Sequence, residues 1–113
     1  MTLAMTTETV LKVDAFDLSD FVNKFYEFTP IVRTIGGVEY KEYPYDFAAV
    51  EESANDTSHE FQVDGYVAEW DRGQLVEWVE SNGVAYISTS AVLDDLCSKG
   101  AIPPGNYVVN VSW

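Results

Sequence analysis

The stretch LSDFVNKFYEFTPIVRTIGGVEYKEY, residues 18–43, decides the fold class, because it joins a helix pattern to a hairpin pattern. Apolar residues recur every three or four positions until Pro30, which predicts an amphipathic helix that ends before the proline. Gly36 and Gly37 then stand between two runs of β-forming residues, which predicts a tight hairpin. The helix residues expected to face the core are Leu18, Phe21, Val22, Phe25 and Phe28.

The rest of the chain predicts further short elements of both kinds. Runs rich in β-branched and apolar residues predict strands at 9–16, 60–70, 84–88 and 106–113. Runs with helical spacing predict two more helices, at 72–83 and 89–99. We therefore expect a single α+β domain over residues 1–113, with a mostly antiparallel sheet of about four to six strands and two or three short helices.

Side chains that can cap a helix mark where the helices are expected to begin. Asp17 or Ser19 is expected to cap the first helix, Asp71 the second, and Ser88 or Thr89 the third. In the second helix the apolar spacing predicts a buried stripe with one tryptophan at its edge. The stripe consists of Leu75, Val76 and Val79, and the tryptophan is Trp78.

Cysteine usage and hydropathy predict a protein of the host bacterial cytoplasm. Cys97 is the single cysteine, so an internal disulfide is excluded, and its helical context predicts a buried, unreactive thiol. No apolar run approaches the roughly 18 residues of a membrane span, and the start lacks a basic segment followed by an apolar one. Residues 1–7 are expected to be flexible, and Met5 is an alternative start. We expect a monomer or a homodimer.

Residues 51–60, EESANDTSHE, contain no large apolar side chain and predict an exposed loop. His59, the one histidine of the chain, lies in this loop, which argues against a role as catalytic base. The acids around it have neither the spacing of a calcium-binding EF-hand loop nor that of a zinc site. We therefore expect no metal and no other cofactor.

The sequence also argues against an enzyme. No G-x-S-x-G elbow accompanies the histidine, and the two glycines of the hairpin are not followed by the Lys-Ser/Thr of a phosphate-binding loop. A chain of 113 residues leaves little room for a cleft between paired carboxylates. Direct binding of nucleic acid is not expected either, because the six basic residues are scattered and the net field repels phosphate.

The charge balance predicts the class of partner. Nineteen acidic and six basic residues give a formal net charge of -13. Hydrophobic residues make up 47% of the chain and aromatic residues 14%, which is enough for a folded core and argues against an acidic disordered tail. A surface of this sign attracts cationic surfaces. We therefore expect a basic protein as the partner.

Two groups of acids form the predicted contact surface. Nine lie between residues 51 and 80, where only Arg72 opposes them, and a second group is interleaved with tyrosines, which are enriched at interfaces. Carboxylates on strands and helices lie about 5 to 7 Å apart, which allows them to occupy some of the phosphate positions in a basic groove. The predicted partner-binding residues are Glu39, Glu42, Tyr43, Tyr45, Asp46, Glu51, Glu52, Asp56, Glu60, Asp64, Glu69, Asp71, Glu77 and Glu80.

These features predict an acidic inhibitor that acts as a DNA mimic. It would present carboxylates and tyrosines to the basic nucleic-acid-binding groove of a host defence protein. In size and charge the chain resembles the inhibitors that phages and other mobile elements direct against host nucleases, restriction enzymes and CRISPR complexes. The resemblance is one of composition, so it assigns a role to no residue.

Two alternative functions are consistent with the same size and charge. An immunity or antitoxin protein would bind one basic toxin through a central aromatic anchor, such as Trp70, Trp78 or Tyr45, ringed by acids. A structural or accessory virion protein would assemble with copies of itself. Because identical acidic subunits repel each other, that assembly would need a neutral face, such as the uncharged C-terminal strand.

Overall fold

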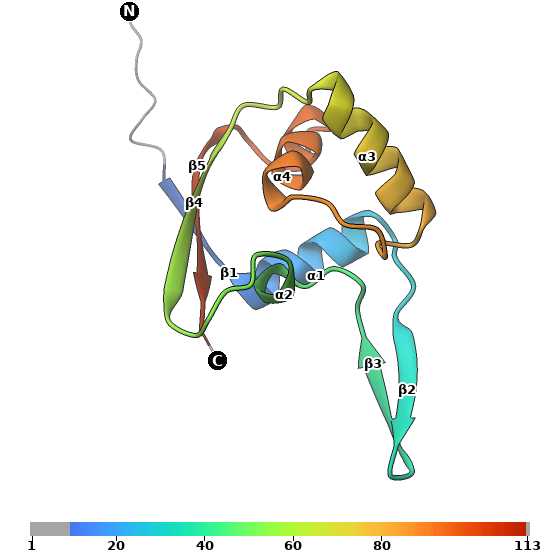
Figure 1. Cartoon of the computed structure of the whole chain (residues 1–113). Coiled ribbons are helices and arrows are strands. Elements are labelled where there is room, and N and C mark those ends of the chain that lie inside the picture. The colour runs from blue at the N-terminus through green and yellow to red at the C-terminus, as the bar shows by residue number, and fades with distance from the viewer. Residues whose placement is uncertain (1–9, 113) are drawn as a thin grey trace, which may run out of the picture.

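The computed structural model describes residues 10–112, and the expectations for residues 1–7, Met5 and Trp113 lie outside this range (Figure 1). The described chain contains both strands and helices, and the predicted α+β fold is confirmed. In chain order the elements are β1 (Val10–Asp14), α1 (Ala15–Phe25), β2 (Ile31–Ile35), β3 (Val38–Glu42), α2 (Phe47–Val50), β4 (Thr57–Val63), α3 (Glu69–Glu80), α4 (Thr89–Ser98) and β5 (Gly105–Val111).

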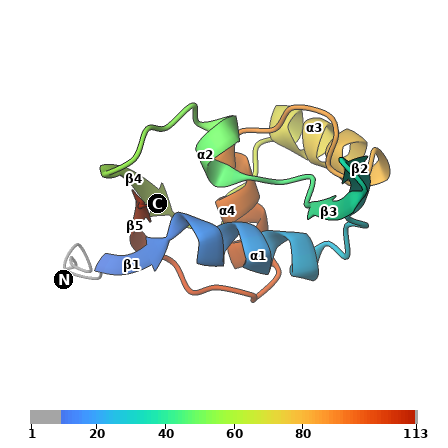
Figure 2. The ribbon, with the colours of Figure 1, turned by 90° about the horizontal axis from the view of Figure 1, so that it is seen from below.

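β5 is the central strand of a three-stranded sheet with the order β1-β5-β4. It pairs parallel with β1 and antiparallel with β4. Its side chains alternate between the two faces, and Tyr107, Val109 and Val111 are buried on one of them. The helices gather on one side of the sheet (Figures 1 and 2). The strand predicted over 106–113 is therefore confirmed for its described residues, and it is held in the sheet by a neighbour on each side.

The first strand and helix meet earlier than the sequence suggested. Asp14, and neither Asp17 nor Ser19, caps α1, because its carboxylate accepts a hydrogen bond from Phe16 N at 2.8 Å. The Ser19 hydroxyl donates to Ala15 O inside the helix and accepts from Phe47 N. The strand predicted over 9–16 therefore ends at Asp14.

The predicted exposed loop at 51–60 is wrong in its second half. β4 begins at Thr57 and pairs with β5. The His59 ring packs against Phe47 with their centroids 5.4 Å apart, and it exchanges a 2.6 Å hydrogen bond with Ser53 Oγ. Alternate polar residues of this segment thus face inward, a pattern that a search for large apolar side chains does not detect.

β4 also ends sooner than predicted. The backbone turns after Val63, and Gly65 takes a φ of 83°. A Cβ at Gly65 would lie 3.3 Å from Cys97 Sγ, so the backbone approaches α4 closely at this glycine. Cys97 is half-buried rather than fully buried, and burial raises the pKa of its thiol above the ordinary value.

The strand predicted at 84–88 is wrong, because the segment runs between two helix ends. The helix predicted over 72–83 ends at Glu80, Asn82 and Gly83 follow it with positive φ, and Ser88 caps α4 as expected by accepting a hydrogen bond from Ala91 N. The four residues between them pair with no strand in the described chain. Ile87 is buried in this segment, whereas Tyr86 is exposed.

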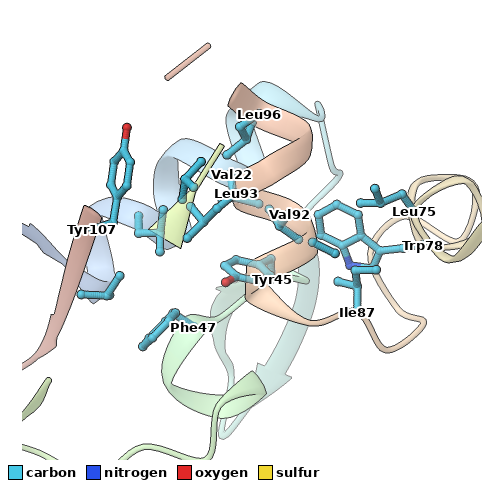
Figure 3. Close-up of a cluster of buried hydrophobic side chains, with 14 of the residues drawn as sticks. Val22, Tyr45, Phe47, Leu75, Trp78, Ile87, Val92, Leu93, Leu96 and Tyr107 are labelled. Carbon is cyan, nitrogen blue, oxygen red and sulfur yellow. The ribbon is translucent and has the colours of Figure 1, made fainter. Parts of the chain in front are cut away.

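The predicted buried face of α3 is correct at Leu75, which is 5% exposed, and wrong at its other two positions. Val76 and Val79 are exposed, and Trp78 is the side chain that enters the core, with only 1% of its surface accessible. Its ring centroid lies 4.8 Å from those of both Tyr26 and Phe28 (Figure 3 shows the surrounding core). A tryptophan ring buries far more apolar surface than a valine, so its packing determines the orientation of the helix. α3 begins after Ala68, and Asp71 lies in its first turn rather than at its cap.

Tyr45 belongs to the core, so its predicted role as a surface contact is wrong. It is 1% exposed, and its hydroxyl exchanges a 2.8 Å hydrogen bond with Thr89 Oγ1. The buried Asn23 side chain donates to Tyr45 O at 2.7 Å and accepts from Tyr45 N at 3.1 Å. The ring is therefore held by its hydrogen bonds as well as by packing (Figure 3), and it is not available to a partner.

The buried tyrosines predict instability in alkali. Burial raises the pKa of Tyr45 above its ordinary value, and burial with a hydrogen bond to Asp95 raises the pKa of Tyr26. Unfolding frees both rings to ionise near pH 10, so stability holds below that pH and is lost as pH rises above it. For Tyr45 we expect the free energy of unfolding to fall by up to about 1.4 kcal/mol per pH unit. Urea titrations at pH 8 and in steps above pH 10 measure this slope.

A Tyr45→Phe variant is the control for the alkaline experiment. It removes one of the two titrating hydroxyls and should make the slope above pH 10 shallower, leaving the share of Tyr26, even though the lost hydrogen bond to Thr89 lowers stability at pH 8. An unchanged slope in this variant would show that Tyr45 does not carry the effect.

The predicted hairpin is confirmed. β2 and β3 pair antiparallel, and Gly36 and Gly37 form the two-residue turn with φ values of 58° and 82°. Positive φ at both positions is what this turn type requires. All ten strand residues are exposed, and the hairpin projects away from the helices and the larger sheet (Figure 1).

Candidate functional site

The structure distributes the predicted partner-binding residues over several separate elements. Glu39 and Glu42 lie on the projecting hairpin, Glu60 on β4, and Glu69, Asp71, Glu77 and Glu80 on α3 (Figure 1). The remaining ones lie in the connecting segments or at the ends of α2: Tyr43, Tyr45, Asp46, Glu51, Glu52, Asp56 and Asp64.

Several of these acids already have partners within the fold. Asp46 caps α2 by accepting a hydrogen bond from Ala48 N. Glu51 accepts from Thr89 N, and Asp64 accepts from Tyr66 N. Glu42 forms an ion pair with Arg33 at 3.2 Å. These contacts give the acids local structural roles, which a charge count does not distinguish from a binding role.

One surface of α3 brings acids and aromatic rings together in a shallow groove of about 640 Å³, which we call the α3 groove. Trp70 and Tyr86 are its large side chains, and they are 74% and 71% exposed. The groove is lined by Glu69, Trp70, Gly73, Gln74, Glu77 and Tyr86. Of the predicted contact residues, the structure thus places Glu69 and Glu77 beside exposed aromatic rings.

Helical spacing explains how α3 contributes most of this groove. Glu69, Gly73 and Glu77 follow one another at intervals of four residues, so they lie along one side of the helix. Trp70 and Gln74 form the neighbouring line. At 1.5 Å per residue, the two glutamates stand about 12 Å apart along the axis, and they bracket the middle of the groove.

Tyr86 reaches the groove from the segment that follows α3. Gly83 N donates to Trp78 O at 2.8 Å, and Ala85 N donates to Ser81 Oγ at 3.0 Å, so the chain folds back over the helix end. Ile87 is buried directly afterwards. Tyr86 was not predicted as a site residue, because its segment was interpreted as a strand.

Gly73 forms an open part of the groove. It lies inside α3, and a Cβ added there would meet nothing within 4 Å. Since glycine costs about 1 kcal/mol relative to alanine inside a helix, we expect Gly73→Ala to raise the free energy of unfolding by about 0.5–1 kcal/mol. Urea denaturation measures this change. A loss of stability would show that α3 needs the glycine for its own packing.

The chemistry of the α3 groove suits a cation. A guanidinium or ammonium group is attracted to the face of a tryptophan or tyrosine ring, and a carboxylate beside the ring can accept its hydrogen bonds. Gln74 offers a further carbonyl acceptor. An anion would meet the negative field of Glu69 and Glu77 instead.

A second hollow on the other side of α3 has a different character. Glu80 lies here with Arg72 and with Asp95, whose carboxylate accepts a 2.8 Å hydrogen bond from Lys99 Nζ. Because two basic residues offset its acids, this hollow offers less negative charge to a cationic partner than the α3 groove does. Glu77 and Glu80, which are three residues apart on the helix, therefore line different hollows.

Within residues 10–112, no cluster of three or more His, Cys, Asp and Glu side chains is placed to hold a metal ion. In the same range, no helix is both long and apolar enough to cross a membrane. No protein-family model, curated protein or solved structure matches the chain. The α3 groove and the net charge of the chain are therefore the features that bear on its function.

Proposed function

We propose that this protein is an acidic inhibitor, encoded by a phage or another mobile element, that binds a basic nucleic-acid-binding protein through the α3 groove. The observation that carries the proposal is that Trp70 and Tyr86, two exposed rings, line the same groove as the carboxylates of Glu69 and Glu77. Exposed aromatic rings beside acids are the kind of site at which arginine side chains bind tightly.

Inhibition follows from competition for the same basic side chains. The arginines and lysines of a nucleic-acid groove are placed to contact phosphates, and Glu69 and Glu77 would take the place of some of those phosphates. The net charge of -13 steers the two proteins together at long range. The partner is therefore a nuclease, restriction or CRISPR component whose nucleic acid is displaced, and the inhibitor itself binds no nucleic acid.

An immunity or antitoxin role is the second candidate, and the exposure of Trp70 favours it. That role requires an aromatic anchor ringed by acids, and Trp70 is exposed in such a setting. Trp78 and Tyr45 no longer qualify as anchors because both are buried. The two candidates differ in partner: a toxin antidote binds one basic toxin, whereas a mimic binds a protein that holds nucleic acid.

The test begins with capture of partners by the tagged full-length chain from bacterial lysate at about 50 mM and 500 mM salt, followed by mass spectrometry. We expect a basic nucleic-acid-binding protein that is retained at low salt and lost at high salt. Purified partner and labelled DNA or RNA then show whether the protein displaces the nucleic acid. A single toxin retained at high salt would favour the antidote role, and a partner that keeps its nucleic acid would overturn the proposed inhibition.

Two charge reversals on the same helix test whether the α3 groove makes the contact. Glu77→Lys places a positive charge in the groove and should weaken partner binding by about 30-fold or more, because it turns an attraction into a repulsion. Glu80→Lys makes the same change in overall charge on the other hollow and should weaken binding by only about 3-fold, through the long-range field. Titration of the purified partner with each variant gives both affinities.

Equal losses in the two variants would contradict a contact localised in the α3 groove and would favour a diffuse electrostatic interaction. Both glutamates are exposed, so neither change is expected to unfold the chain. Unfolding curves of both variants check this expectation before the affinities are compared.

A further inference from the structure

We infer that the β2–β3 hairpin is a self-association site at which two copies of this chain pack face to face. The first observation is the exposure of its apolar side chains. Ile31, Val32, Ile35, Val38 and Tyr40 are all exposed. A two-stranded hairpin is marginally stable by itself in water, so a second surface packed on it would stabilise it.

The strand register divides the hairpin into two unequal faces. Residues directly opposite each other in an antiparallel pair share a face, and the pairs are Ile31 with Glu42, Arg33 with Tyr40, and Ile35 with Val38. These six residues form one face, which we call the apolar face. The opposite face has one large apolar side chain, Val32, together with Thr34, Glu39 and Lys41.

The charges of the hairpin favour a second copy as the occupant of this face. Residues 31–42 contain two basic and two acidic side chains, so the hairpin is neutral in a chain of net charge -13. On the apolar face, Arg33 and Glu42 carry opposite charges and form an ion pair. A two-fold axis would bring Arg33 of each copy toward Glu42 of the other, so the face is complementary to itself.

The projection of the hairpin also limits repulsion between the two acidic bodies. Five residues per strand extend about 17 Å, which exceeds the Debye length of about 8 Å at physiological ionic strength. Copies that meet at their hairpins therefore keep their other acids apart. The uncharged C-terminal strand does not serve this purpose, because β5 has a neighbour on each side within the sheet.

The predicted dimer has a salt dependence opposite to that of the proposed partner complex. Salt screens the repulsion between the two acidic bodies and leaves the apolar contact intact, so the dimer becomes tighter as salt increases. The contact area is small, which makes the dimer weak and dependent on concentration. This inference does not rest on the proposed inhibition, since it involves the chain alone.

Sedimentation equilibrium of the purified full-length chain, from about 10 µM to 1 mM and at about 50 mM and 500 mM salt, tests the inference. We expect a monomer–dimer equilibrium whose dissociation constant falls by about 3-fold or more at the higher salt. A monomer under all conditions would overturn the inference. A dimer that dissociates as salt increases would also overturn it, because such a salt dependence indicates an interface held together by opposite charges.

Two valine variants with equal exposure identify the face. Val38 and Val32 are both 53% exposed, but they lie on opposite faces of the hairpin. Threonine keeps the β-branched shape and removes apolar surface. In a two-fold dimer both copies carry the substitution, so the apolar contact is reduced twice. We therefore expect Val38→Thr to raise the dissociation constant about 10-fold and Val32→Thr to change it less than 2-fold. Equal effects of the two variants would overturn the assignment of the face.

Discussion

Replacing Trp78 with alanine should lower the free energy of unfolding by about 3–5 kcal/mol, the range for loss of a large aromatic side chain from a core. The indole is 1% exposed and packs against Tyr26 and Phe28 with ring centroids 4.8 Å away. Since small domains are stable by only about 5–15 kcal/mol, we expect this variant to be largely unfolded or to melt far below the parent protein. Thermal and urea unfolding followed by circular dichroism measure the loss.

Trp70→Ala is the matched control for this prediction, because the same residue type is removed from the same helix. Trp70 is 74% exposed, so its loss should change the free energy of unfolding by less than about 0.5 kcal/mol. The Trp70 variant should instead bind the basic partner more weakly. If the two tryptophan variants were equally unstable, the orientation of α3 described here would be wrong.

The second large effect is expected at Gly83, where α3 ends. The residue has a φ of 81°, and an added Cβ would lie 2.9 Å from Pro44 Cβ and 3.1 Å from a ring carbon of Phe28. Gly83→Ala therefore combines an unfavourable backbone conformation with overpacking. We expect a loss of about 2–4 kcal/mol in the free energy of unfolding, measured by urea denaturation.

Gly100 separates the two causes. Its φ is 77°, close to that of Gly83, but a Cβ there would meet nothing within 4 Å. Gly100→Ala should therefore cost only about 1 kcal/mol, from the backbone conformation alone. The excess loss at Gly83 measures the contact with Pro44 and Phe28, and losses of similar size at both glycines would mean that this contact relaxes easily.

Local signals in the sequence were sufficient to predict the elements with strong end markers. The Gly36–Gly37 turn, the Asn82–Gly83 helix end and the Ser88 cap each act within a few residues, and all three appear in the structure as expected. The strand predicted over 106–113 also appears, as β5. Such features depend on backbone conformations that only a few residue types favour.

Predictions failed where tertiary packing outweighed local pattern. The spacing of Val76 and Val79 suggested that they lie on the buried face of α3. Trp78 is buried instead, because its ring has a larger apolar surface than a valine side chain. The sequence groups Tyr45 with other tyrosines and acids on a predicted contact surface. In the structure it lies inside the core, where it forms hydrogen bonds with Asn23 and Thr89. The presence of Tyr86 and Trp70 in the lining of one groove depends on the path of the chain after α3, which no local pattern encodes.

The parallel pairing of β1 with β5 has a consequence for how the chain reaches its native state. Val10 pairs with Asn106, so this ladder joins segments from nearly opposite ends of the described chain. Closing so long a loop has an entropic cost before any contact offsets it, and such pairings form slowly. The helices and the hairpin can form from contacts between residues close in sequence, whereas the three-stranded sheet needs β1 and β5 to meet. We expect the helices and the hairpin to form before the sheet, and the strand edges that stay open until β1 meets β5 make the partly folded chain prone to aggregation.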